Sequence, residues 1–163
     1  MKHTIKLFAI STLLLGATVA QADWKQDLKD AAVQKGSNTA AEKLGLATTA
    51  PTGAKVYIIS PKNGDTVTSP VTVQFGLSGA GVAPAGTQIE GTGHHHLLVD
   101  DPTVDLTKAL PASDQVVHFG KGQTETSLKL KPGKHTLQLL FADWKHQPFN
   151  PSIASEKITI TVK

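Results

Sequence analysis

Histidine is the residue type through which this sequence could do chemistry. Three of its 7 histidines are consecutive, at His94, His95 and His96. Because side chains alternate between the two faces of a β-strand, a strand here would place His94 and His96 on one face and His95 on the other. Two imidazoles on one face can bind a single metal ion, with distant parts of the chain supplying the other ligands.

Two further histidines are candidates for those additional ligands. His118 stands directly before Phe119 and Gly120, and His146 follows a few residues after Asp143. The chain has no cysteine and its one methionine is the initiator, so a site would offer nitrogen and oxygen donors but no sulfur. Such donors suit Cu(II) or Zn(II), which makes copper or zinc the cofactor that the sequence indicates. The predicted ligand set is His94, His96, His118 and His146.

The two remaining histidines of the main body are predicted to be structural. His95 would share its strand face with Leu97 and Val99, which indicates a position in the core. His135 lies in the run Pro-Gly-Lys-His-Thr-Leu and would share a face with Leu137. β-Sandwiches often place a corner tyrosine at such a position, where it ties a loop to the following strand.

Other groups of polar residues give little support for a second site or for catalysis. Asp100, Asp101 and Asp105 could bind Ca²⁺, but acidic residues beside Pro102 are typical of a solvated turn, which we predict here. No nucleophile elbow, dinucleotide-binding loop or catalytic triad can be recognised. We therefore predict that the protein is not an enzyme.

The charged residues argue against nucleic acid as a partner. All 16 basic residues are lysine, and without arginine the bidentate contacts that read bases and clamp phosphates are missing. Of the net charge of +3, two lysines lie in residues 1–22, where there is no acidic residue, so the rest of the chain carries +1. A chain so close to neutrality is not expected to present a basic surface to nucleic acid or to anionic lipid.

The N-terminal residues are typical of a secretory signal peptide. A basic start is followed by the apolar run of residues 7–20 and by an Ala-x-Ala cleavage signature at residues 20–22. The apolar run is too short to span a bilayer, and no cysteine stands at the cleavage point to accept a lipid. With residues 1–22 as the signal peptide, we predict a periplasmic or secreted protein that is not a lipoprotein and keeps no membrane span.

The rest of the chain divides into a leader and a strand-rich body. Residues 23–53 are predicted to form a helical leader and a linker, because apolar residues recur at helical spacing after Trp24 and because Pro51 and Gly53 follow. In residues 54–163 the hydrophobic period changes to about 2, and about seven short strands are separated by turn signals. These signals include Asn63-Gly64, Pro132-Gly133 and Asn150-Pro151. The pattern favours an all-β fold, an antiparallel β-sandwich of the immunoglobulin type.

Several motifs of the body resemble those of a family of exported bacterial domains of unknown function. They are Gly-His-His-His-Leu at residues 93–97, His-Phe-Gly at 118–120, Gly-Gln-Thr-Glu at 122–125 and Pro-Gly-Lys-His-Thr-Leu-Gln-Leu at 132–139. The resemblance covers residues 56–162 and implies an exported Ig-like β-sandwich without implying an activity. The chain departs from the family pattern at Phe149, where a second histidine after His146 is expected. If that histidine is a ligand in the family, Phe149 removes one ligand here.

Two functions therefore stay open. In the first, the protein is a non-catalytic binding module that holds copper or zinc through the four histidines, as a carrier or a buffer. In the second, it is a periplasmic Ig-like structural or interaction domain whose histidines are hydrogen-bonded internally, and its partner is another envelope protein. Geometry separates the two, because a shared ion requires nitrogens of at least three rings to converge within about 4–5 Å of one another.

Overall fold

The computed structural model of this chain describes residues 29, 32–33, 35–36, 39, 44 and 46–163. The predicted signal peptide lies outside these residues, as does most of the predicted leader. No helix within the described ranges is both long enough and apolar enough to cross a membrane.

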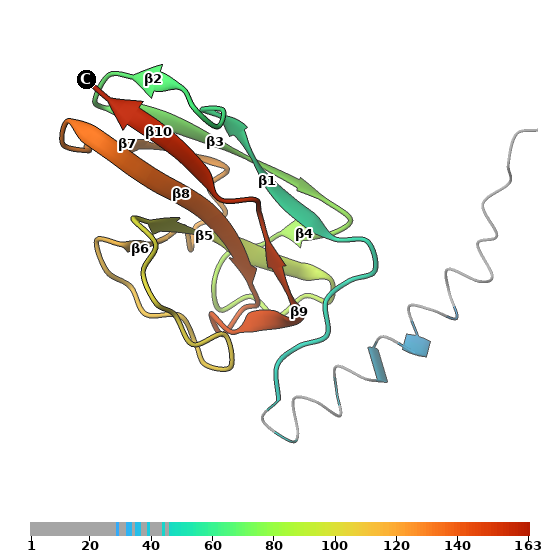
Figure 1. The fold of residues 1–163 in the computed structure, drawn as a ribbon. Coiled ribbons are helices and arrows are strands. Elements are labelled where there is room, and N and C mark those ends of the chain that lie inside the picture. The colour runs from blue at the N-terminus through green and yellow to red at the C-terminus, as the bar shows by residue number, and fades with distance from the viewer. Residues whose placement is uncertain (1–28, 30–31, 34, 37–38, 40–43, 45) are drawn as a thin grey trace, which may run out of the picture.

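Residues 46–163 form an all-β fold, shown in Figure 1, whereas the described residues 29, 32–33, 35–36 and 39 are helical. Its strands are β1 (Lys55–Ser60), β2 (Thr66–Val67), β3 (Val71–Ser78), β4 (Gly81–Val82), β5 (Thr92–Val99), β6 (Val116–His118), β7 (Glu125–Leu128), β8 (Gly133–Ala142), β9 (Pro148–Ala154) and β10 (Ile158–Val162). The predicted all-β class is confirmed. The prediction of about seven strands missed the short strands β2 and β4 and the edge strand β9.

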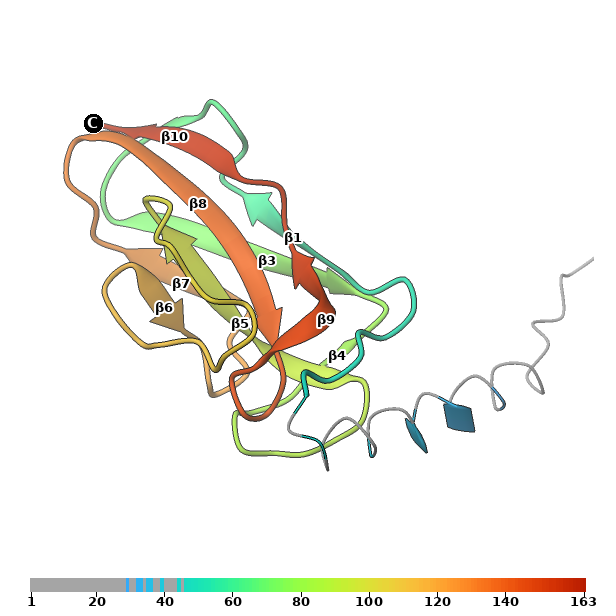
Figure 2. The same cartoon turned by 60° about the horizontal axis from the view of Figure 1, so that its bottom comes forward.

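The strands form two sheets. The small sheet has the order β1-β3-β7, and the large sheet runs β2-β10-β8-β5-β4, with β6 also paired to β5 and β9 also paired to β8. Most neighbours are antiparallel, although β10 pairs with β2 and β4 pairs with β5 in parallel. In Figure 2, β3 of the small sheet lies behind β8 of the large sheet, as expected for a sandwich.

The prediction of a turn at Asn150-Pro151 is wrong, because both residues lie inside β9. β9 is an edge strand that pairs with β8, and the register of this pair shifts between Phe141 and Ala142. Proline cannot donate a backbone hydrogen bond and is tolerated only at edges and irregularities of this kind. The edge position of β9 is set by tertiary pairing, which is why local turn residues gave the wrong expectation.

The main core lies between the two sheets. It is formed by alternate residues of facing strands, among them Val71, Val73 and Phe75 of β3, Leu97 and Val99 of β5, and Leu137, Leu139 and Phe141 of β8. Alternation then places the intervening residues of β5 on the outer face of the large sheet.

The outer face of the large sheet is also covered. Leu98, Leu140 and Ala142 of this face form a second cluster with Val116 and with Leu110, which comes from the segment between β5 and β6. Consequently every residue of β5 from Gly93 to Val99 is buried. A strand with both faces buried explains how two histidines can lie on the outer face of a sheet and still be shielded from water.

Candidate metal centre

His94 and His96 lie on the outer face of β5. Their register partners on β8 are Ala142 and Leu140, which belong to the outer cluster. Both side chains are fully buried, and their ring centroids are 4.8 Å apart. The paired arrangement predicted from the His-x-His spacing is therefore present.

His118 reaches the same place from the neighbouring strand. The register of β6 on β5 sets His118 directly opposite His96, and its ring centroid lies 5.2 Å from that of His96 and 5.1 Å from that of His94. Gly120 gives this ring its space, since a Cβ added at Gly120 would lie 2.4 Å from His118 Nε2. The glycine of the His-Phe-Gly motif thus permits the orientation of the histidine.

His146 completes the group from the loop between β8 and β9. Its ring centroid lies 4.7 Å from that of His118, 4.9 Å from that of His94 and 6.0 Å from that of His96. The backbone of His146 has a φ of 67°, the left-handed region that residues other than glycine seldom adopt. All four residues predicted as ligands are thus brought together, and we call them the histidine cluster.

Three members of the histidine cluster could hold a metal ion. His94, His96 and His118 each offer a ring nitrogen, and these nitrogens lie within 4.8 Å of one another. Nitrogens bonded tetrahedrally to one ion at about 2.0–2.1 Å are about 3.3–3.4 Å apart, so the nitrogens would have to approach one another by up to about 1.5 Å to bind a shared ion. Neither His146 nor Asp143 is a member of this group, although the ring of His146 lies beside those of His94 and His118.

Several buried ring nitrogens of the cluster have no hydrogen-bond partner among the described residues. Within the described part of the chain, neither nitrogen of His94 or His96 has a hydrogen-bond partner, and the same is true of His118 Nε2. Buried polar groups are normally paired, and an unpaired one points to an unseen ion or water. Hydrogen bonds to backbone carbonyls, the alternative explanation for the cluster, are therefore not found at the rings of His94 and His96 within the described residues.

His94, His96 and His118 favour the neutral form. Burial, reinforced by the neighbouring imidazoles, lowers the pKa of His94 to about 4 and that of His96 to about 3. Burial and the adjacent His146 also lower the pKa of His118. A neutral imidazole has a free lone pair, which is the form that binds metal ions.

A family model described as a domain of unknown function, DUF4399, matches residues 73–163, more than half of the chain. The chain belongs to the DUF4399 family. No curated protein and no solved structure gives a significant match. The predicted membership of a family of unknown function is confirmed, and the DUF4399 match includes the whole histidine cluster.

The departure from the expected family pattern at Phe149 removes no ligand from the cluster. Phe149 is buried in the core between the sheets, and its ring stacks on that of Phe141 at a centroid distance of 6.0 Å. A histidine at this position would point into the core.

His95 and His135 lie outside the cluster. His95 is fully buried between the sheets against the rings of Phe75 and Phe141, as predicted. Burial lowers the pKa of His95 to about 4, and its ring nitrogens, like those of His94 and His96, have no hydrogen-bond partner among the described residues. His95 therefore belongs to the packing of the sandwich.

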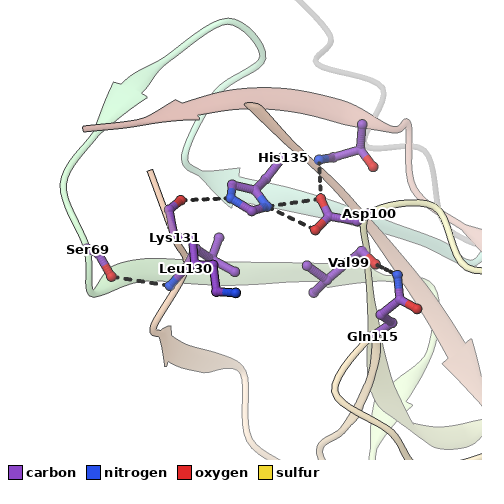
Figure 3. A network of polar contacts seen from close by, with 8 residues as sticks. Ser69, Val99, Asp100, Gln115, Leu130, Lys131 and His135 are labelled. Atoms are coloured by element: carbon purple, nitrogen blue, oxygen red, sulfur yellow. Dashed lines mark hydrogen bonds and ion pairs between the residues drawn. The ribbon is translucent and has the colours of Figure 1, made fainter. Parts of the chain in front are cut away.

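His135 fastens a turn to the end of a strand, as Figure 3 shows. Its Nδ1 is 3.0 Å from both carboxylate oxygens of Asp100, and its Nε2 donates to the carbonyl of Lys131 over 2.9 Å. Burial alone would lower the pKa of His135, but these two contacts together raise it. The structural role predicted for His135 agrees with this geometry.

The three carboxylates considered for Ca²⁺ are engaged separately. Asp100 binds His135, Asp101 pairs with Lys157, and Asp105 accepts hydrogen bonds from the backbone and the hydroxyl of Thr107. The hydroxyl of Thr107 is the main cause that lowers the pKa of Asp105 to about 2. The arrangement is that of a solvated turn, as the sequence predicts.

Proposed function

We propose that this domain is a non-catalytic module that binds one divalent transition metal ion through the histidine cluster. His94, His96 and His118 supply three nitrogens, and His146 supplies the fourth. The observation that carries the proposal is the convergence of buried ring nitrogens that have no other partner. A metal ion satisfies them at once and offsets the cost of burying them unpaired.

Copper or zinc fits the donor set best. The ligands are imidazoles, which suit Cu(II) and Zn(II), whereas hard ions such as Ca²⁺ and Mg²⁺ require oxygen. Among divalent first-row metals, Cu(II) forms the more stable complexes with a given set of nitrogen ligands. We therefore expect both metals to bind, and Cu(II) more tightly than Zn(II).

The composition of the cluster favours holding a metal over catalysis. Catalytic zinc sites keep three protein ligands and one open position for water or substrate, whereas four protein ligands close a tetrahedral site. The ligand group found among the described residues contains histidines alone, without a carboxylate to act as a general base. A closed, all-imidazole site suits a carrier or a buffer of metal ions.

Export is part of the proposal and rests on the N-terminal residues. The basic start, the apolar run and the Ala-x-Ala signature predict removal of residues 1–22. The chain has no cysteine, so in a periplasmic or secreted protein no thiol of its own would compete with the histidines for copper or zinc. N-terminal sequencing of protein recovered from the periplasmic fraction tests this point, since the predicted first residue is Asp23.

Metal titration tests the proposed site directly. The protein is purified without a histidine tag and titrated with Cu(II) and Zn(II), beside the double variant His94→Ala/His96→Ala. One equivalent should bind to the wild type, and the double variant should lose at least about a hundredfold in affinity, since it lacks two ligands. His135→Gln serves as the control, because it removes a histidine outside the cluster. Equal affinities of the double variant and the wild type would refute the site.

A further inference from the structure

The loop that carries His146 is built around one buried carboxylate. Asp143 is 2% exposed, and its Oδ1 accepts hydrogen bonds from the backbone N–H groups of Lys145 and Gln147, over 2.8 Å and 3.0 Å. The backbone N–H of His146 also donates to the carbonyl of Asp143 over 2.9 Å, and that of Asp143 donates to Gln147. The chain is thereby folded tightly around Asp143, and His146 is the last residue of the turn that begins at Asp143.

This loop fixes the backbone of His146 from several sides. Besides the bonds around Asp143, the carbonyl of His146 accepts a hydrogen bond from the backbone N–H of Leu110 over 2.9 Å. A left-handed conformation of a residue other than glycine persists only where its surroundings determine it. The contacts of Asp143 and Leu110 are those surroundings, and they direct the imidazole of His146 towards the other three rings.

The second oxygen of Asp143 is held by a distant part of the chain. Thr48 Oγ1 donates to Asp143 Oδ2 over 2.7 Å. Thr48 precedes β1, in the teal segment that runs beside β9 in Figure 1. That segment is attached there by two backbone hydrogen bonds, from Asn150 N–H to the Thr48 carbonyl and from Ala50 N–H to the Asn150 carbonyl.

We propose that Asp143 is the positioning residue for the fourth metal ligand, His146, and that Thr48 links this ligand to the N-terminal segment. The inference rests on the proposed metal site and goes further, because it names residues that touch no metal. When the Thr48 contact is intact, His146 completes the site. When it is broken, the loop relaxes, and His94, His96 and His118 hold the metal as a three-histidine site with one open position.

Two variants separate this positioning role from a general effect on folding. Thr48→Val removes the hydroxyl but keeps the shape of the side chain, and Asp143→Asn keeps the size but removes the charge. Thr52→Val is the matched control, since Thr52 is an exposed threonine of the same segment. Partners of metal ligands typically contribute about 10–100-fold to affinity, so Thr48→Val and Asp143→Asn should weaken Cu(II) binding by about tenfold or more.

A double-mutant cycle with His146→Ala tests directly whether Thr48 acts through His146. In the His146→Ala background, Thr48→Val should cause no further loss of Cu(II) affinity, because the ligand that it positions is gone. The Cu(II) electron paramagnetic resonance spectra of Thr48→Val and His146→Ala should also resemble each other and differ from that of the wild type. The same loss in both backgrounds, or no loss in either, would overturn the positioning role.

Failure of the proposed function would be seen separately. If the double variant His94→Ala/His96→Ala binds Cu(II) as the wild type does, the site itself is wrong, and the positioning role is wrong with it. If that variant loses binding while Thr48→Val, Asp143→Asn and Thr52→Val all bind as the wild type does, the site stands and only the role of Asp143 and Thr48 is refuted.

Discussion

His96 and His118 face each other across the β5–β6 pair, with ring centroids 5.2 Å apart. Residues directly opposite one another on antiparallel strands have the shortest separation between Cβ atoms, so this register brings the rings together without a bend in either strand. The register therefore makes part of the proposed metal site a property of the sheet, and sites built on strands are held more rigidly than sites built on loops.

Gly120→Ala should weaken metal binding more than it weakens folding. The added Cβ would lie 2.2 Å from Cε1 and 2.4 Å from Nε2 of His118, so the ring must move away from its present position. Because the His118 side chain can move more easily than backbone, the free energy of unfolding should fall by only about 1 kcal/mol. Titration calorimetry with Cu(II) should show a loss of about tenfold or more.

The matched control for Gly120→Ala is Gly36→Ala, where the added Cβ meets nothing within 4 Å. It should bind Cu(II) as the wild type does. Unchanged Cu(II) affinity in Gly120→Ala would show that the orientation of His118 does not matter for the site.

The metal-free protein should lose stability as the pH falls below about 6.5. In the folded state the pKa of His94 is lowered to about 4 and that of His96 to about 3, from 6.5. Between these values the unfolded chain binds more protons than the folded chain, so the free energy of unfolding rises with pH in this window and levels off above it. Each unit of pKa corresponds to about 1.4 kcal/mol, so the lowered pKa values of His94 and His96 together correspond to at most about 8 kcal/mol.

Urea unfolding at a series of pH values measures this effect, with His94→Ala/His96→Ala as the comparison. The variant should show a shallower dependence, since it lacks two of the groups that titrate. Added Zn(II) should stabilise the wild type, by about 2.7 kcal/mol at a hundredfold excess over the dissociation constant, and should do so less at low pH. A wild type and a variant with the same pH dependence would contradict the neutral, buried state of the two histidines.

Phe149→His should not strengthen metal binding, although it restores the histidine expected from the family pattern. Phe149 is 3% exposed and packs in the core against Phe141, away from the outer face that carries the cluster. The substitution removes apolar contacts and buries a polar ring, at a cost of about 2–4 kcal/mol of stability. Thermal unfolding measures the loss of stability, and Cu(II) titration of the same sample measures the affinity. A gain in affinity or a second bound equivalent would contradict the placement of Phe149 in the core.

All four residues of the cluster could be predicted from the sequence, whereas the positioning of His118 and His146 beside the other two could not. Alternation along the Gly-His-His-His-Leu run correctly separated His94 and His96 from His95, because it depends only on the geometry of one strand. Residue types also selected His118 and His146. The register that sets His118 opposite His96 is a long-range pairing that no local pattern encodes.

Asp143 was missed as a functional residue for a related reason. Its role depends on backbone N–H groups of its own loop and on Thr48, which is 95 residues away in the sequence. The sequence did contain one signal for this role, because a carboxylate stands shortly before a predicted ligand. Aspartate commonly accepts hydrogen bonds from backbone N–H groups that follow it closely in the chain.

The strand β9 was missed because Asn150-Pro151 has the composition of a turn, while its pairing with β8 is decided by the tertiary structure.

X-ray absorption spectroscopy of the protein loaded with one equivalent of Zn(II) or Cu(II) tests the central claim most directly. The metal-binding proposal predicts a first shell of four imidazole nitrogens at about 2.0–2.1 Å, with no sulfur, and a nitrogen count that falls in His94→Ala/His96→Ala. A shell dominated by oxygen without imidazole scattering, or a metal that is lost on dialysis, would contradict it.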